Sequence, residues 1–293
     1  MTAENSGASE RCEEPRGPRD RRGMFTSGIV SRKDGRDIAL FLSGEKHAGE
    51  NLEDVLRRRA AGLKTPIQMA DAVSRNVPKE FRVVLANCLA HARRKFVEVV
   101  ASFPEECRHV LESLATVYRN DEAAQGMSAE ERLRFHQEHS GPLVEELRCW
   151  MLREIDGRKV EPNSGLGEAI RYALAHWEKL TRFLQVPGAP LDNNIVERAL
   201  KKCILHRKNS LFYKTKRGAW VGDTLMSLIY TCELSGENPF EYLTVIQKHA
   251  RELAANPGEW MPWTYRETLA RLGARGGALR GGDAPHPRPG EGA

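Results

Sequence analysis

The sequence has no apolar run that approaches the roughly 18 residues a helix needs to cross a membrane. Its N-terminus has no apolar segment like that of a secretory signal peptide. Cysteine is sparse, with six residues scattered over 293 and no Cys-x-x-Cys pair. These absences exclude helical membrane proteins and disulfide-stapled secreted domains. They predict a cytoplasmic protein whose thiols are reduced and mostly buried.

Two Cys–His pairs at short spacing are the remaining hint of a metal site. Cys88 lies three residues before His91, and Cys107 lies two residues before His109. A structural zinc ion takes four ligands, and neither pair has a second pair beside it in a usable pattern. The sequence therefore predicts no zinc site.

Charge is nearly balanced overall but unevenly placed along the chain. Lys and Arg number 45 against 40 Asp and Glu, which gives a net charge of +5. The cations are densest between Arg198 and Arg217, and such a cluster is typical of a surface that binds nucleic acid. With 40% hydrophobic residues, a chain of this length can bury a core in one large domain or two smaller ones.

The first ordered part of the chain has the pattern of an α/β core. Asp34-Gly35 is a strong hairpin turn signal between two apolar runs. The elements expected are strands at about 25–30 and 38–42, a helix at about 48–59, a strand at about 65–71, a strand at about 83–88 and a helix from about 91. This order predicts a mixed sheet with helices on both faces.

The part that follows lacks strand patterns. Apolar residues from about 103 to 185 recur at helical spacing, interrupted between Gly157 and Gly167, which predicts an all-helical insertion. Further helices are expected after 192, at 221–234 and from 238. The predicted divisions are a disordered tail at 1–23, a first core part at 24–102, the insertion at 103–186, a second core part at 187–250 and an extension at 251–293 that is disordered from about 273.

One stretch, from Pro190 to Trp220, stands out by its charge. After Asp192, a natural N-cap, its single acidic residue is Glu197, and its other charged residues are cations. A lone carboxylate among cations suits a ligand that holds a metal ion beside the phosphates of a nucleic acid. The alternative is a solvated amphipathic helix with one ion pair between Glu197 and Lys201.

The order of residues in this stretch resembles the C-terminal signature of the IS66-type transposases. The pattern is Asp192-Asn193-Asn194-x-x-Glu197-Arg198, then Arg207-Lys208-Asn209-x-x-Phe212 and Gly218-Ala219, and later Asn238-Pro239-Phe240-Glu241-Tyr242-Leu243. The resemblance covers roughly residues 24–249. It implies an RNase H-like fold and a DDE triad of acids. Glu197 would be the last acid and a ligand of Mg²⁺ or Mn²⁺ in a two-metal site.

The same resemblance assigns the second acid of the triad to Asp71, at the end of a predicted strand. The carboxyl ends of strands are where α/β sheets place their sites. The alternative role for Asp71 is a helix N-cap or turn residue. The family has an Asp-Gly-Tyr type sequence here, whereas this chain has Asp71-Ala72-Val73. Asp71 and Glu197 are thus the predicted catalytic residues and metal ligands.

A further segment, from Cys88 to Phe96, resembles the family's Cys-x-x-His-Ala-Arg-Arg-Lys-Phe stretch. His91 is either a contact to phosphate or metal, or a hydrogen-bonded structural residue. The cations after it either contact phosphate or form a solvated face. The residues predicted to contact DNA are Arg93, Arg94, Lys95, Asn193, Asn194, Arg198, Lys201, Lys202, Arg207, Lys208, Lys214, Lys216 and Arg217.

The chain departs from the family at the first acid, which is expected on a first strand within an Asp-Glu-Thr-Pro motif. No such motif occurs, and the acids before the hairpin lie in a tail without a strand pattern: Glu4, Glu10, Glu13, Glu14 and Asp20. The sequence therefore predicts an RNase H-like sheet that lacks its first strand and exposes an edge. The predicted function is a truncated and impaired DNA transposase. The alternative is a non-catalytic helical protein that binds DNA or assists assembly.

The resemblance also implies partners and a location. The partners would be DNA, at the ends of an insertion sequence and at its target, together with accessory proteins of the same element. The chain would form a homo-oligomer on DNA. It would work with the nucleoid in the cytoplasm and with no membrane.

Overall fold

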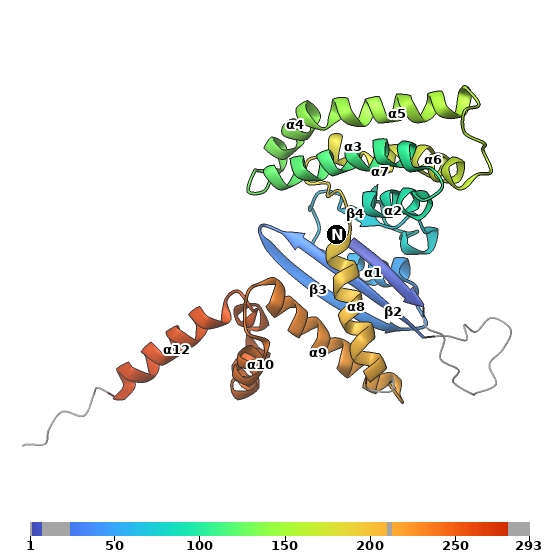
Figure 1. The fold of residues 1–293 in the computed structure, drawn as a ribbon. Helices are drawn as coiled ribbons and strands as arrows, with labels where there is room; N and C mark the ends of the chain where they lie inside the picture. Colours follow the sequence, from blue (N-terminus) through green and yellow to red (C-terminus); the bar gives the residue numbers. More distant parts are fainter. Residues whose placement is uncertain (1, 8–23, 210–212, 281–293) are drawn as a thin grey trace, which may run out of the picture.

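The computed structural model of the chain describes residues 2–7, 24–209 and 213–280 (Figure 1). Its strands are β1 (Thr2–Gly7), β2 (Phe25–Lys33), β3 (Arg36–Gly44), β4 (Ile67–Ala70) and β5 (Val84–Asn87). They form one sheet in the order β3-β2-β1-β4-β5. β2 runs antiparallel to β1 and β3, while β4 runs parallel to β1 and β5. The predicted α/β class with a mixed sheet is confirmed.

The predicted hairpin forms β2 and β3. Asp34 and Gly35 have φ angles of 52° and 73°, in the left-handed region that a two-residue hairpin turn requires. Successive residues of β2 face opposite sides of the sheet. Ile29 packs with Leu52 on one side, and Val30 packs with Val196 on the other.

β1 corrects two of the expectations. The sequence predicted a missing first strand and a tail without regular structure at 1–23. Instead, residues 2–7 lie inside the sheet, paired with β2 from Thr2–Val30 to Gly7–Phe25 and with β4 at Thr2–Met69. The segment has no apolar alternation, which is why the pattern missed it. A central strand is held by main-chain hydrogen bonds, and these need no particular side chain. Residues 8–23 lie outside the described part.

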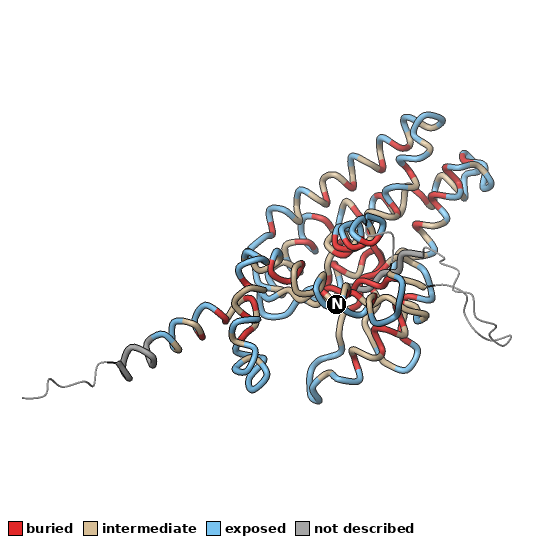
Figure 2. The backbone as a smooth tube through the Cα atoms, turned by 90° about the horizontal axis from the view of Figure 1, so that it is seen from below, coloured by how far each residue is buried: buried red, intermediate tan, exposed pale blue. Residues whose placement is uncertain are grey.

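Helices cover both faces of the sheet (Figure 1). The helix α1 (Ala48–Arg57) packs on one face, and α8 (Asn194–Asn209) and α9 (Lys216–Leu234) pack on the other. α8 approaches the sheet closely at Gly28, because a Cβ atom there would lie 3.0 Å from Leu200. Buried residues concentrate along these contacts and inside the helical layer, which is formed by the helices between residues 89 and 184 (Figure 2).

The segment between β5 and α8 is helical throughout its described elements, as predicted. They are α2 (Leu89–Val99), α3 (Pro104–Ala123), α4 (Ala129–His139), α5 (Gly141–Asp156), α6 (Gly165–Ala175), α7 (Trp177–Leu180) and the 3-10 helix η2 (Arg182–Leu184). Their own core contains Phe96, Leu166 and Ile170, and Ile67 of β4 packs against it. The predicted interruption at 157–167 covers the break between α5 and α6 and extends over the first three residues of α6.

The C-terminal part continues with α10 (Pro239–Lys248), α11 (Ala250–Ala255), η3 (Pro257–Trp260) and α12 (Tyr265–Arg280). Gly236, with a φ angle of 72°, follows α9, and the Asn238 side chain caps α10. α12 corrects the prediction of disorder from about 273, because its backbone is helical to Arg280. Residues 281–293 lie outside the described part. Among the helices that the structure describes, none is long and apolar enough to cross a membrane.

A partly buried ionic network joins α3 to α4, and it gives a first testable prediction. The Asp121 carboxylate accepts hydrogen bonds from His136 at 2.9 Å and from Arg132 at 3.0 Å. Burial alone would raise the pKa of Asp121, but these two partners outweigh it, so the pKa lies below its ordinary value of 3.8. A lowered carboxyl pKa stabilises the fold above that ordinary value, and this stability is lost as the pH falls through the lowered pKa.

We expect Asp121→Asn to lower the free energy of unfolding by about 2 kcal/mol at neutral pH. The difference from the wild type should shrink steadily below pH 3.8, where the wild-type carboxyl group also becomes neutral. Urea denaturation followed across that range measures both effects. The exposed Asp156→Asn is the matched control, and a difference that stayed constant with pH would contradict the assignment.

Candidate metal and nucleic-acid site

The site begins where two parallel strands end side by side. β4 and β5 are paired from Ile67–Val84 to Ala70–Asn87, and the Cys88 N–H donates to the Ala70 carbonyl at 3.1 Å. Asp71 and Cys88 therefore follow neighbouring strands at the same edge of the sheet. Asp71 lies at the carboxyl end of a strand, as predicted from the sequence.

The start of α8 is tied to this same edge. The Leu89 N–H at the start of α2 donates to the Leu191 carbonyl at 2.9 Å. Asp192 then accepts the Asn194 N–H at 3.0 Å. Because α8 begins at Asn194, the residue in the N-cap position is Asn193, and the sequence placed the cap one residue too early. Glu197 lies in the first turn of α8 and thus reaches the end of β5.

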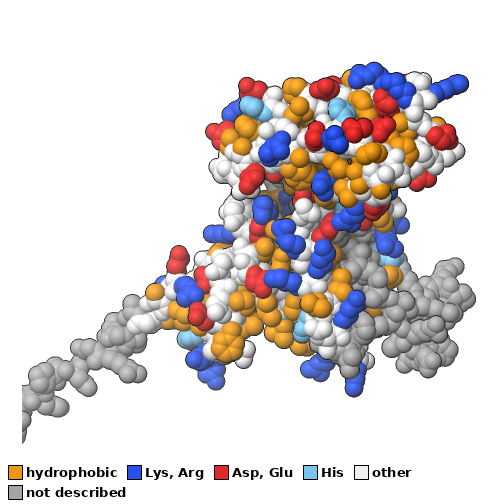
Figure 3. Space-filling view, in the orientation of Figure 1, with side chains coloured by type: hydrophobic (Ala, Val, Ile, Leu, Met, Phe, Trp, Pro, Cys, Tyr) orange, Lys and Arg blue, Asp and Glu red, His pale blue; other side chains and the backbone are white. Residues whose placement is uncertain are grey.

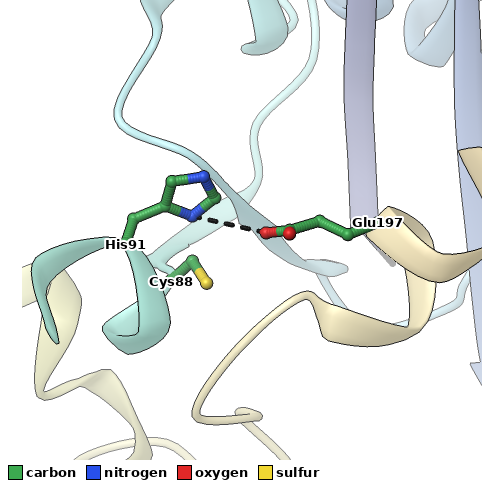
Figure 4. Close-up of side chains that lie close together, drawn as sticks. All are labelled: Cys88, His91 and Glu197. Carbon is green, nitrogen blue, oxygen red and sulfur yellow. Dashed lines mark ion pairs between the residues drawn. The ribbon is translucent and has the colours of Figure 1, made fainter. Parts of the chain in front are cut away.

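Three side chains meet at this point: Cys88, His91 and Glu197 (Figure 4). Their potential ligand atoms all lie within 4.8 Å of one another. His91 Nδ1 is 3.6 Å from Glu197 Oε1, and both atoms are buried without a hydrogen-bond partner among the described residues. Arg94 Nη2 lies 3.7 Å from the other oxygen, Glu197 Oε2. Glu197 is therefore flanked by ionisable groups and is not a solvated helix residue.

Cys88 is the buried member of the three, with 1% of its surface exposed. Burial raises the pKa of its thiol to about 12, although the main-chain N–H groups of Asn193, His91 and Ala90 act in the opposite direction. Sequence reasoning set this cysteine aside. The signal was its spacing from His91, but the third member of the group lies on α8, about a hundred residues further along the chain.

Asp71 is held by its own turn. Its Oδ1 accepts hydrogen bonds from Asn76 Nδ2 at 2.5 Å and from the Val73 N–H at 3.3 Å. Burial and, as the second cause, the negative charge of Asp71 raise the pKa of Tyr172. The Lys95 ammonium group lies 4.6 Å from the centre of the Tyr172 ring. Asp71 therefore has the turn role that the sequence offered as an alternative, and it also lies at the sheet edge. Asp71 is not one of the three clustered side chains.

Most of the predicted DNA-contacting cations lie on the surface. Figure 3 shows Lys and Arg side chains gathered over α8, beneath the helical layer. Lys202 and Lys216 form ion pairs with Glu233 and Glu45, and Asn194 and Lys95 are partly buried. The exposed cations of the set are Arg93, Arg94, Arg198, Lys201, Lys202, Lys208, Lys214, Lys216 and Arg217.

Two members of the predicted set are buried, which corrects the expectation for them. Arg207 is 3% exposed and its guanidinium group donates to Thr26 Oγ1 at 2.5 Å. Asn193 is 0% exposed and lies beneath the start of α8. The Arg207 side chain faces the sheet because the helical period carries its position to the packed side of α8.

Three proteins of Sinorhizobium fredii (strain NBRC 101917 / NGR234) are similar to the chain. The uncharacterized protein y4jD is 40% identical over 54% of this chain, y4qI is 33% identical over 63% and y4hP is 32% identical over 69%. The matches cover 31%, 34% and 38% of those proteins, so the chain spans about a third of the length of these relatives. No solved structure matches it.

The family model described as "Transposase IS66 family" matches residues 28–220. This range contains most of β2, the strands β3 to β5, the helices α2 to α7 and α8 with Glu197. It covers more than half of the chain. The chain therefore belongs to the IS66 family of transposases.

Proposed function

We propose that this chain carries the catalytic-core region of a DNA transposase that cleaves and joins DNA with divalent metal ions. The single observation that carries the proposal is the meeting of α8 with the end of β5. It brings Glu197 to the sheet edge that Asp71 also occupies. Two acids at the carboxyl edge of parallel strands, beside a surface rich in Lys and Arg, suit phosphoryl transfer on a polyanion.

The sheet supports an RNase H-like reading of the fold. Three antiparallel strands, β3, β2 and β1, continue into the parallel strands β4 and β5, and helices lie on both faces. The expectation of an impaired enzyme depended partly on a missing central strand, and β1 removes that reason. β1 also contains one acidic residue, Glu4, two positions after Thr2 in the register.

Asp71 and Glu197 are the residues that would hold Mg²⁺ or Mn²⁺. Carboxylate oxygens are the ligands these ions prefer, and Glu197 Oε1 is a buried oxygen without a hydrogen-bond partner among the described residues. When bound, the metal activates the attacking oxygen and stabilises the leaving one. Asn76 and the Val73 N–H keep the Asp71 carboxylate oriented, and Arg94 offsets the charge of Glu197.

Nicking of supercoiled DNA in the presence of Mn²⁺ tests the catalytic proposal. We expect the chain to nick DNA and Asp71→Asn to slow nicking at least about tenfold, because a ligand carboxylate is lost. Asp156→Asn, a matched change at an exposed position, should leave the rate unchanged. Glu4→Gln belongs in the same series, since Glu4 is the acid on β1. Equal rates for the wild type and Asp71→Asn would overturn the role of Asp71.

A second candidate is a protein that binds DNA without chemistry, because the exposed cations continue along α8 and into α9, away from the acids. Under either function we expect the double variant Lys201→Ala/Lys208→Ala to change the slope of log K for DNA binding against log salt concentration. The slope should become shallower by about two units, one for each phosphate contact that is lost. Lys64→Ala, an exposed change just before the amino end of β4, is the control. An unchanged slope of DNA affinity against salt concentration would show that these α8 lysines do not contact DNA. DNA binding without Mn²⁺-dependent nicking would favour the second candidate.

A further inference from the structure

We propose that Cys88, His91 and Glu197 form a binding site for a zinc-type divalent cation. The site lies beside the proposed Mg²⁺ acids and shares Glu197 with them, so only that sharing depends on the proposed function. Its ligands come from the end of β5, the first turn of α2 and the first turn of α8. The sequence alone gave no zinc site, because the third ligand joins only in the folded chain.

The distances suit such an ion. Zinc binds sulfur at about 2.3 Å and nitrogen or oxygen at about 2.0–2.2 Å, so tetrahedral ligand atoms stand roughly 3.3–3.8 Å apart. His91 Nδ1 and Glu197 Oε1 are already 3.6 Å apart, too far for a hydrogen bond and suited to sharing one ion. All the ligand atoms fall within 4.8 Å, which small side-chain rotations can close. Figure 4 shows the three side chains converging on one space.

Two buried polar atoms without a hydrogen-bond partner among the described residues also favour a cation at this position. Nδ1 of His91 and Oε1 of Glu197 are buried and have no hydrogen-bond partner among the described residues. A buried polar atom left in that state costs roughly 1–3 kcal/mol, and a shared cation would satisfy both atoms at once. The main-chain N–H groups of Asn193, His91 and Ala90 lie close enough to the Cys88 sulfur to counteract the rise of its thiol pKa on burial, and such donors also support a metal-bound thiolate.

The types of ligand select the ion. Thiolate and imidazole favour Zn²⁺ and similar transition metals, whereas Mg²⁺ takes oxygen ligands. Three protein ligands leave a fourth position open, the arrangement of zinc sites that bind a water or a substrate atom. Arg94 is 55% exposed at its side chain, so it can leave Glu197 Oε2 when a cation arrives.

Absorption spectroscopy with Co²⁺, on protein first stripped with a chelator, tests the site without any measure of activity. We expect a thiolate-to-cobalt charge-transfer band that Zn²⁺ abolishes and that a large excess of Mg²⁺ leaves intact. Cys88→Ser should lose the band. Glu197→Gln should weaken Co²⁺ binding at least about tenfold. Circular dichroism of each variant shows whether it is folded.

Matched variants separate this inference from the proposed function. Cys149→Ser, at a partly exposed thiol elsewhere, should keep the band. Asp71→Asn should also keep it, although that variant is expected to nick DNA at least about tenfold more slowly. No band in the wild type, or a band that persists in folded Cys88→Ser, would overturn the zinc-type site and leave the transposase proposal untouched. Slower nicking by Asp71→Asn with the band retained supports both.

Discussion

Glu197→Gln is expected to reduce Mn²⁺-dependent DNA nicking at least about 100-fold, a larger effect than that expected of Asp71→Asn. Metal ligands supply several kcal/mol of charge stabilisation in phosphoryl transfer, and each 1.4 kcal/mol corresponds to a factor of ten in rate. The amide keeps the shape of the side chain but loses its charge. Glu197 also lies within reach of His91 and Arg94, so its replacement alters the whole centre. Initial rates of nicking at fixed Mn²⁺ measure the effect.

Glu98→Gln provides the control for this prediction. Glu98 is exposed on α2, the helix that also carries His91 and Arg94. Both variants replace a glutamate by glutamine, but only Glu197→Gln changes a residue of the Cys88–His91–Glu197 cluster. Both should bind DNA with similar affinity at matched salt, because neither change removes a cation. A Glu197→Gln protein that nicks DNA as fast as Glu98→Gln would place the chemistry elsewhere.

Arg207→Met is expected to lower the free energy of unfolding by about 3 kcal/mol or more. Arg207 donates to Thr26 on β2, whose hydroxyl lies 2.8 Å from that of Ser43 on β3. The Ser43 N–H and hydroxyl donate to the carboxylate of Asp223 on α9 at 2.5 and 2.9 Å. Burial raises the pKa of Asp223, and Ser43 and then Arg207 counteract it. Removing the cation leaves the buried carboxylate poorly compensated.

Lys208→Met is the neighbouring control, because Lys208 is exposed on the same helix and the change in chemistry is the same. Its effect on unfolding should stay within about 0.5 kcal/mol. Chemical denaturation of both variants compares them directly. Lys208→Met should instead weaken DNA binding. If Arg207→Met unfolded at the same denaturant concentration as Lys208→Met, the buried network would not stabilise the fold.

These two adjacent residues show where sequence reasoning reaches its limit. Arg207 and Lys208 belong to one basic run and were predicted as one kind of DNA contact. The structure separates them because one faces the sheet and the other faces solvent. A helix pattern can propose a buried face. Only the packing of α8 against β2 shows that a guanidinium group there meets a hydroxyl group.

Local features were determined by the sequence itself. The hairpin at Asp34-Gly35, the cap at Asn238, the helical segment from 103 to 185 and the position of Asp71 after a strand all depend on residues a few positions apart. The family signature around Glu197 also lies within one continuous stretch, and the match over residues 28–220 agrees with it. Such short-range patterns can be recognised in the sequence without knowledge of the fold.

Tertiary structure alone decided the rest. β1 enters the sheet through main-chain pairing, which leaves no mark on the side-chain pattern. Cys88 and His91 gain the third member of their cluster only because α8 is tied to the end of β5 through Leu89 and Leu191. The physical reason is the same in both cases. Groups far apart in sequence are brought together by hydrogen bonds and packing that form only when the whole sheet and its helices assemble.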